Sequence, residues 1–157
     1  MVGHPVARNG HREATSENSL PAGIKDRIAA GQAVLVQLLR SPKFGFDSNL
    51  WGSLPEEHGI YRIFEIGSAP TRTLHAGRTK SAQGGLRQRV YQNHYMGDQS
   101  GNIRAQLVKS GRCTDKEAAK KFLRRNCKIQ FFVIENEAER KWAEHFMLSI
   151  LRPEESD

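Results

Sequence analysis

The chain has 157 residues, with 24 Lys and Arg against 17 Asp and Glu, a formal net charge of +7, and only two cysteines. This length fits one domain that buries a core without stabilising cross-links. The lack of a CxxC pair or secretory leader pattern argues against a disulfide scaffold or a four-ligand zinc site, and predicts a reducing, cytoplasmic compartment. No stretch reaches the ~18 apolar residues of a membrane span, and the positive charge favours an acidic partner, with nucleic acid first.

Two regions precede the expected main domain. Residues 1–19 are polar, rich in Gly, Asn and Ser, and without hydrophobic periodicity, so we expect a disordered tail. Residues 20–53 predict one helix, because apolar residues recur at helical spacing from Ile24 to Leu39 and prolines bound this run on both sides. A loop follows whose aromatic residues favour anchoring in the core over ligand contact; they are Phe44, Phe46 and Trp51.

The remaining residues, 54–157, alternate between strand and helix patterns. Two β-branched runs around the turn sequence GSAP predict a hairpin within residues 59–77. Three helices, a buried strand and a last helix then follow. The helices are expected around Leu86, within 102–111, and after a Thr114–Glu117 capping box. The strand is expected within 128–134, and the last helix after a cap at Asn136. This order predicts an α+β domain with a small central antiparallel sheet of about three strands, flanked by α-helices.

Positive charge is concentrated between Arg72 and Lys128, where fourteen Lys and Arg face three carboxylates. On the helix expected after Thr114, five cations repeat every four residues opposite the apolar face. Such a stripe is either a phosphate-binding surface or an ordinary solvated face, and the regional excess favours phosphate binding. The candidate nucleic-acid-binding residues are Arg78, Lys80, Arg87, Arg104, Lys116, Lys120, Lys121, Arg124 and Arg125.

The last helix contains a carboxylate in an apolar setting. Within residues 142–151 the only ionisable side chains are Glu144 and His145. Burying a carboxylate there requires a cation, hydrogen bonds or a metal ion. Arg140, one turn earlier, offers an i, i+4 ion pair, and periodicity alone favours that interpretation.

Short motifs recur in a fixed order along residues 54–157. They are HGIY at 58–61, LHAGRT at 74–79, GLRQRV at 85–90, and WAEHF at 142–146 followed by LRP. The ordered set resembles the GIY-YIG nuclease family. By this resemblance Tyr61 is the first family tyrosine, His75 stands where the family has a second tyrosine, and Arg89 is the helix arginine. The family histidine falls on Asn93, with His94 one residue further on.

The resemblance implies a divalent-metal-dependent endonuclease that hydrolyses DNA by in-line attack of water with one metal ion. Its catalytic residues would be Tyr61, His75, Arg89, His94 and Glu144. Tyr61 would orient or deprotonate the water, Arg89 would hold a phosphate oxygen, and Glu144 would bind one Mg²⁺ or Mn²⁺. One carboxylate suffices, because Mg²⁺ keeps most of its waters.

The expected partner is DNA, with double-stranded DNA favoured over structured or single-stranded forms, and no membrane. Two alternatives stay open. One is a degenerate nucleic-acid-binding module that keeps the fold and the basic surface but has lost turnover through His75 and through the absence of the asparagine that the family has after its terminal proline. The other is a domain for protein contacts, supported only by the acidic C-terminal segment.

Overall fold

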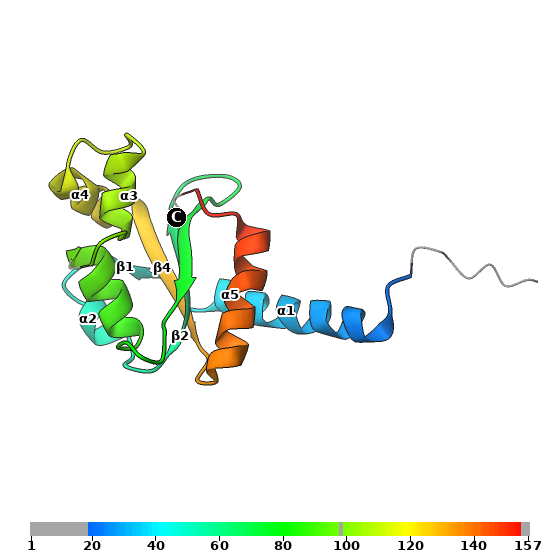
Figure 1. Cartoon of the computed structure of the whole chain (residues 1–157). Coiled ribbons are helices and arrows are strands. Elements are labelled where there is room, and N and C mark those ends of the chain that lie inside the picture. The colour runs from blue at the N-terminus through cyan, green and yellow to red at the C-terminus, as the bar shows by residue number, and fades with distance from the viewer. Residues whose placement is uncertain (1–18, 98, 155–157) are drawn as a thin grey trace, which may run out of the picture.

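A four-stranded antiparallel sheet lies between two groups of helices in the computed structural model (Figure 1). The structure describes residues 19–97 and 99–154, so the expected tail lies almost entirely outside the described residues. The strand order is β1-β4-β2-β3. The predicted α+β class is confirmed, and the sheet has one strand more than the expected three.

The strands are β1 (Phe44–Gly45), β2 (Gly59–Glu65), β3 (Thr73–Arg78) and β4 (Cys127–Val133). The helices are α1 (Ala22–Arg40), α2 (Leu50–Ser53), the π-helix η1 (Arg87–Met96), α3 (Ile103–Lys109), α4 (Lys116–Asn126) and α5 (Glu137–Leu151). The additional strand β1 falls in the aromatic segment that was expected to be a loop. In the part of the chain that the structure describes, no helix has the length and apolar content to cross a bilayer.

The expected hairpin of β2 and β3 fixes which residues share a face of the sheet. Tyr61 lies opposite Gly77, and Ile60 lies opposite Arg78. Because side chains alternate along a strand, Tyr61, Gly77 and His75 belong to one face, and Ile60 and Arg78 belong to the other. This division decides where the candidate site residues meet.

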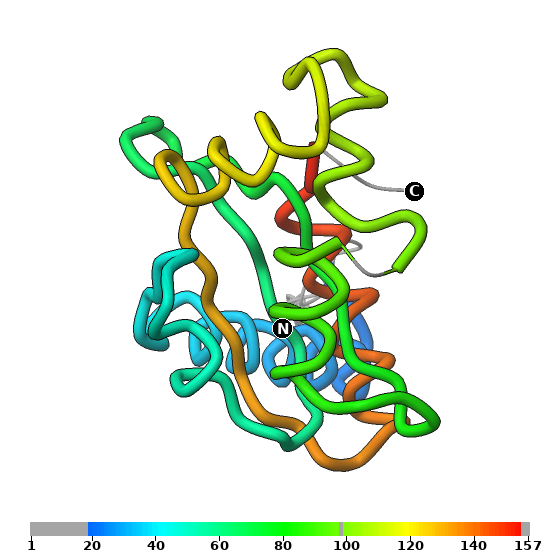
Figure 2. Tube along the Cα trace, turned by 90° about the vertical axis from the view of Figure 1, so that its left-hand side faces the viewer, coloured from blue at the N-terminus to red at the C-terminus, as the bar shows by residue number. Residues whose placement is uncertain are grey.

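Each face of the sheet carries its own buried core. The face of Tyr61 is covered by η1, α2, α3 and α4, the side from which Figure 2 views the molecule. The buried side chains there include Leu86, Val90, Ile103, Leu107 and Leu123. The opposite face is covered by α1 and α5, whose buried contributions are Leu38, Ala143 and Met147.

The last two helices begin at side-chain caps. Asn136 caps α5 as expected, its Oδ1 accepting a hydrogen bond from the backbone N–H of Glu139. The predicted cap of α4 is wrong by one residue. Asp115, not Thr114, is the N-cap, and its Oδ1 accepts from Ala118 N at 2.7 Å. Its carboxylate also complements the positive end of the helix dipole.

Candidate active site

Tyr61 is the centre of a buried polar cluster beneath η1. Its side chain is fully buried in β2, and Arg89 Nε donates to Tyr61 Oη at 3.1 Å. His94 Nε2 lies 2.6 Å from the same oxygen, and His75 Nε2 of β3 lies 3.5 Å away. The structure therefore brings together four of the five residues that the motif resemblance assigns to catalysis.

The π-helical form of η1 places Arg89 and His94 on one side of that helix. In an α-helix, residues five apart differ by about 140° around the axis, so their side chains point in different directions. In a π-helix, with its i→i+5 hydrogen bonds and more residues per turn, such residues point in more similar directions. The one-residue offset between Asn93 and His94 is thus compensated by the type of helix.

The hydrogen bonds of His94 select its tautomer. The backbone N–H of Ile103 donates to His94 Nδ1 at 3.2 Å, so this nitrogen carries a lone pair. Burial lowers the pKa of His94 well below 6.5, and the neighbouring His75 and Arg89 charges lower it further. The neutral ring therefore carries its proton on Nε2 and donates it to Tyr61 Oη, an assignment made from the hydrogen-bond network.

Tyr61 consequently accepts hydrogen bonds from two donors and keeps its own proton. Burial raises the pKa of Tyr61 to about 12, an increase that the Arg89 charge and hydrogen bond partly offset and the Glu144 charge reinforces. With Arg89 and His94 donating to the oxygen, the hydroxyl proton is directed elsewhere. His75 Nε2, at 3.5 Å, lies in position to accept it.

We predict that His94→Gln flattens the pH dependence of stability between about pH 7 and 5. Native His94 stays neutral, whereas a histidine in the unfolded chain gains a proton below its ordinary pKa of about 6.5. The free energy of unfolding of the wild type should therefore fall, as pH decreases, by up to about 1.4 kcal/mol per pH unit. Urea unfolding of both proteins at several pH values measures the two slopes. Equal slopes would contradict a buried neutral His94.

Glu144 lies on the other face of the sheet and pairs with Arg78. Arg78 Nε donates to Glu144 Oε2 at 2.8 Å. The ion pair of Glu144 with Arg140 that periodicity alone favours does not form. Arg140 is fully buried and donates to Thr79 O at 2.8 Å and Ile134 O at 2.7 Å. It ties α5 to the segments that follow β3 and β4, and the cation beside Glu144 comes from β3 instead.

Gly77 and Gln99 complete the site, and neither was among the predicted site residues. A Cβ at Gly77 would lie 3.0 Å from Tyr61 Oη, so only glycine leaves this hydroxyl uncrowded. Gln99 Oε1 accepts from Arg89 Nη1 at 2.7 Å. The glycine of LHAGRT was a usable signal for Gly77, whereas nothing in the sequence distinguished Gln99.

Glu144 is the predicted metal ligand, and Arg78 binds one of its two carboxylate oxygens. The Glu144 side chain is 20% exposed, and Arg78 holds Oε2 as outer-shell partners hold ligating carboxylates, leaving Oε1 for coordination. Within residues 19–97 and 99–154, no group of three or more His, Cys, Asp and Glu could form a complete cage. A cation here would take one protein oxygen, with waters and phosphate as its other ligands, which suits Mg²⁺.

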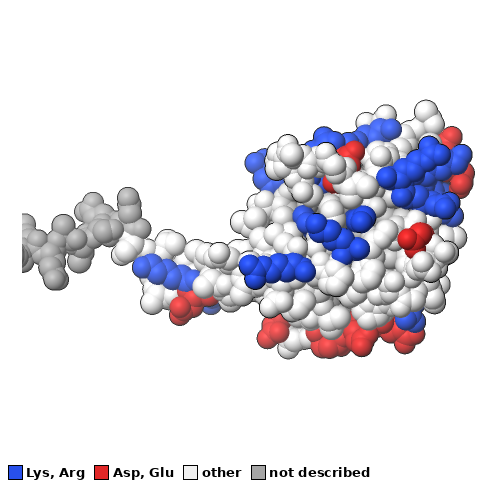
Figure 3. Space-filling view, turned by 180° about the vertical axis from the view of Figure 1, so that it is seen from behind, with Lys and Arg blue, Asp and Glu red and all other residues white. Residues whose placement is uncertain are grey.

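Four of the nine predicted phosphate-binding cations lie exposed on α4; they are Lys116, Lys121, Arg124 and Arg125. Lys121, Arg124 and Arg125 line a hollow of about 350 Å³. Figure 3 shows Lys and Arg gathered at the upper right of the molecule seen from behind, where α4 lies. Lys80 is also exposed, and Lys120 places its Nζ 5.3 Å from the Tyr95 ring.

Three of the predicted cations have structural partners. The predicted phosphate-binding role of Arg104 is corrected by the structure, because Arg104 is buried and donates to the carbonyls of Tyr95 and Met96. It joins η1, α3 and α4 and is not part of the exposed surface. Arg87 is half-buried and donates to Leu54 O at 2.9 Å. The third, Arg78, is the partner of Glu144 described above.

Comparison of the chain with protein-family models, curated proteins and solved structures finds no match. The resemblance to GIY-YIG nucleases therefore rests on the motifs of the sequence alone.

Proposed function

We propose that the protein is a divalent-metal-dependent endonuclease that hydrolyses DNA phosphodiester bonds. The observation that carries the proposal is the meeting at Tyr61 Oη of His75 from β3 with Arg89 and His94 from η1. Glu144 lies on the other face of the sheet, and its charge makes the smallest contribution to the raised pKa of Tyr61. A phenol, two imidazoles, a guanidinium and a carboxylate together supply the groups that phosphoryl chemistry needs.

Arg89 would hold the phosphate. Its Nε donates to Tyr61, while its Nη1 donates to the neutral amide oxygen of Gln99. A phosphate oxygen is a stronger acceptor than an amide oxygen, because its bond to a guanidinium is charge-assisted. A phosphate oxygen would replace Gln99 Oε1 as the acceptor of Arg89 Nη1. The charge of Arg89 would then lie beside the reacting phosphate, while Arg89 Nε keeps its hydrogen bond to Tyr61.

Tyr61 and His75 would form the path for the proton of the attacking water. His75 Nε2 takes the hydroxyl proton of Tyr61 and becomes an imidazolium, and the lone pair left on Tyr61 Oη takes a proton from the attacking water. His94 Nε2–H keeps the phenol oxygen aligned throughout. The hydroxide attacks phosphorus, and the departing 3′ oxygen takes a proton from solvent. A Mg²⁺ or Mn²⁺ held by Glu144 would supply charge stabilisation at the phosphate.

The exposed cations of α4 would position the DNA without reading its sequence. Phosphate contacts of Lys and Arg fix the register of a duplex and carry no base information. Because each such contact releases counterions, DNA affinity is expected to fall steeply as salt rises.

The pairing of Arg78 with Glu144 favours a second candidate, the binding module without turnover. The Arg78 guanidinium, 2.8 Å from the Glu144 carboxylate, competes with a cation for the same negative charge. This candidate predicts salt-sensitive DNA binding with no cleavage in any divalent metal.

We predict that Gly77→Ala lowers the cleavage rate on the order of tenfold, since small displacements of reacting groups are costly. The added Cβ would lie 3.0 Å from Tyr61 Oη and 3.3 Å from Cζ, so the phenol must shift. Initial rates of plasmid nicking measure the effect. Gly52→Ala is the control, because a Cβ there meets no described atom within 4 Å. Equal rates for the two variants would contradict a role for the placement of Tyr61.

The proposal is tested by incubating supercoiled plasmid with the protein in Mg²⁺, in Mn²⁺ and in EDTA, beside Glu144→Gln. Nicking or linearisation is expected in either metal, with none in EDTA and none from Glu144→Gln. Glu57→Gln, which alters an exposed carboxylate away from the cluster, should cleave normally. No cleavage under any condition, with retained binding at low salt, would replace the nuclease by the binding module.

A further inference from the structure

The N-terminal half of α1 carries an apolar stripe that no described residue covers. Gly31 and Leu38 are buried against the domain, Gly31 facing the ring of Phe146. The same stripe continues at helical spacing to Ile28 and Ile24. These two side chains are 44% and 46% exposed, and Figure 1 shows this half of α1 projecting away from α5. We call residues 20–28 the arm.

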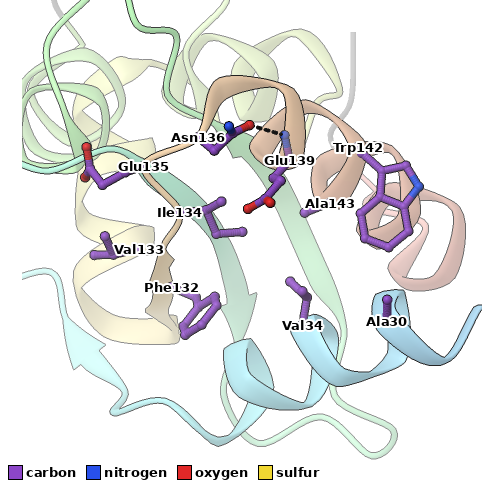
Figure 4. A pocket seen from close by; sticks show the side chains of 10 residues that line it. All are labelled: Ala30, Val34, Phe132, Val133, Ile134, Glu135, Asn136, Glu139, Trp142 and Ala143. Atoms are coloured by element: carbon purple, nitrogen blue, oxygen red, sulfur yellow. Dashed lines mark hydrogen bonds between the residues drawn. The ribbon is translucent and has the colours of Figure 1, made fainter. Parts of the chain in front are cut away.

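An apolar groove lies at the base of the arm. It has a volume of about 570 Å³ and is bounded by α1, α5 and the end of β4 (Figure 4). Ala30 and Val34 of α1 form one wall, and Trp142 of α5 forms part of the other, with 38% of its surface exposed. We call this cavity the groove.

We propose that the arm of a second copy of the chain occupies the groove, giving a two-fold symmetric dimer. The arm cannot enter its own groove, because it continues the straight helix α1 outward from Ala30. In a two-fold contact the same surface serves both partners. Ala30 belongs to α1 and also lines the groove. A two-fold axis near Ala30 would place the arm of each copy in the groove of the other and cover Ile24 and Ile28.

Charge complementarity supports the same occupant. Arg27, Ala30 and Val34 follow i, i+3, i+7 spacing, so Arg27 extends the groove-lining row of α1 onto the arm. Glu139 and Glu135 line the groove, and the carboxylate of Glu139 points over it in Figure 4. Figure 3 shows carboxylates gathered along the lower edge, where β4 runs into α5. Arg27 of one copy would therefore meet Glu139 of the other.

Sedimentation velocity of the full chain at up to about 100 µM tests the dimer. The wild type is expected to show twice the monomer mass of 17.7 kDa. Ile24→Asp combined with Ile28→Asp should sediment as a monomer with unchanged circular dichroism, because both side chains are exposed in a single copy. Ile150→Asp, at the opposite end of α5 and 55% exposed, is the control and should remain dimeric.

Charge exchange tests the pairing itself. Arg27→Glu and Glu139→Arg should each raise the dimer dissociation constant at least about tenfold, and the two together in one chain should restore it. A wild type that stays monomeric, or a dimer that survives the arm substitutions, would overturn the proposal. A double variant no tighter than the single variants would also overturn it.

Discussion

Tyr61→Phe is expected to reduce plasmid cleavage by about 10²–10⁴-fold, the range typical for loss of a proton-transfer group. The ring keeps its place in the core, so the change removes only the hydroxyl at which His75, Arg89 and His94 meet. The proton of the attacking water then has no path to His75. Single-turnover cleavage rates at saturating Mg²⁺ measure the effect.

In the Tyr61→Phe protein, a lower cleavage rate caused by unfolding must be distinguished from one caused by the missing hydroxyl. Without the Tyr61 oxygen, the His94 Nε2–H and the Arg89 Nε–H lose an acceptor, which should cost about 1–3 kcal/mol of stability. Urea unfolding gives that number, and the rate is compared at a temperature where the variant is fully folded. Tyr91→Phe, a half-buried tyrosine of η1, is the control. A Tyr61→Phe protein that cleaves as fast as this control would remove Tyr61 from the mechanism.

Arg89→Lys is expected to reduce the cleavage rate by about 10²–10³-fold while keeping the positive charge. Arg89 uses Nε for Tyr61 and Nη1 for Gln99, so it holds two acceptors at once through a planar fork. An ammonium group is a single point charge and cannot reproduce that geometry. The same single-turnover assay measures the loss.

The matched control is Arg87→Lys, two residues earlier on η1. Arg87 donates to Leu54 O and Glu56 Oε1, away from Tyr61, so its rate should stay within about tenfold of wild type. If Arg89→Lys and Arg87→Lys lost the same activity, the effect would come from DNA binding by η1 as a whole and not from a contact with the reacting phosphate.

The sequence predicts the hairpin well because two local signals agree there. β-branched runs flank a turn, which predicts adjacent strands with Tyr61 near His75. The structure adds the register, in which Tyr61 lies opposite Gly77. The strand β1 was not predicted, because two residues are too few to show alternation of apolar and polar side chains. It is defined by its pairing with β4, in which Phe44 lies opposite Ile129. That pairing lies 85 positions apart in the chain and leaves no local trace.

The helix η1 is the part of the site that sequence reasoning could not settle. π-helices are rare, and a 3.6-residue period gives no reason to align Arg89 with His94. The ion-pair partner of Glu144 likewise depends on tertiary contacts that the local sequence does not show. Local spacing pointed to Arg140, but Arg140 is buried and donates to the carbonyls of Thr79 and Ile134. Arg78 of β3 pairs with Glu144 of α5 instead.

The most direct test of the central claim is the chemistry of the product. Duplex DNA cleaved in H₂¹⁸O with Mg²⁺ should yield 3′-hydroxyl ends and 5′-phosphates that carry one ¹⁸O atom, as read by mass spectrometry of short fragments. This result would show that water attacks phosphorus and the 3′ oxygen departs. A covalent protein–DNA product, ends without solvent oxygen, or uncut DNA in every metal would contradict hydrolysis at the Tyr61 cluster.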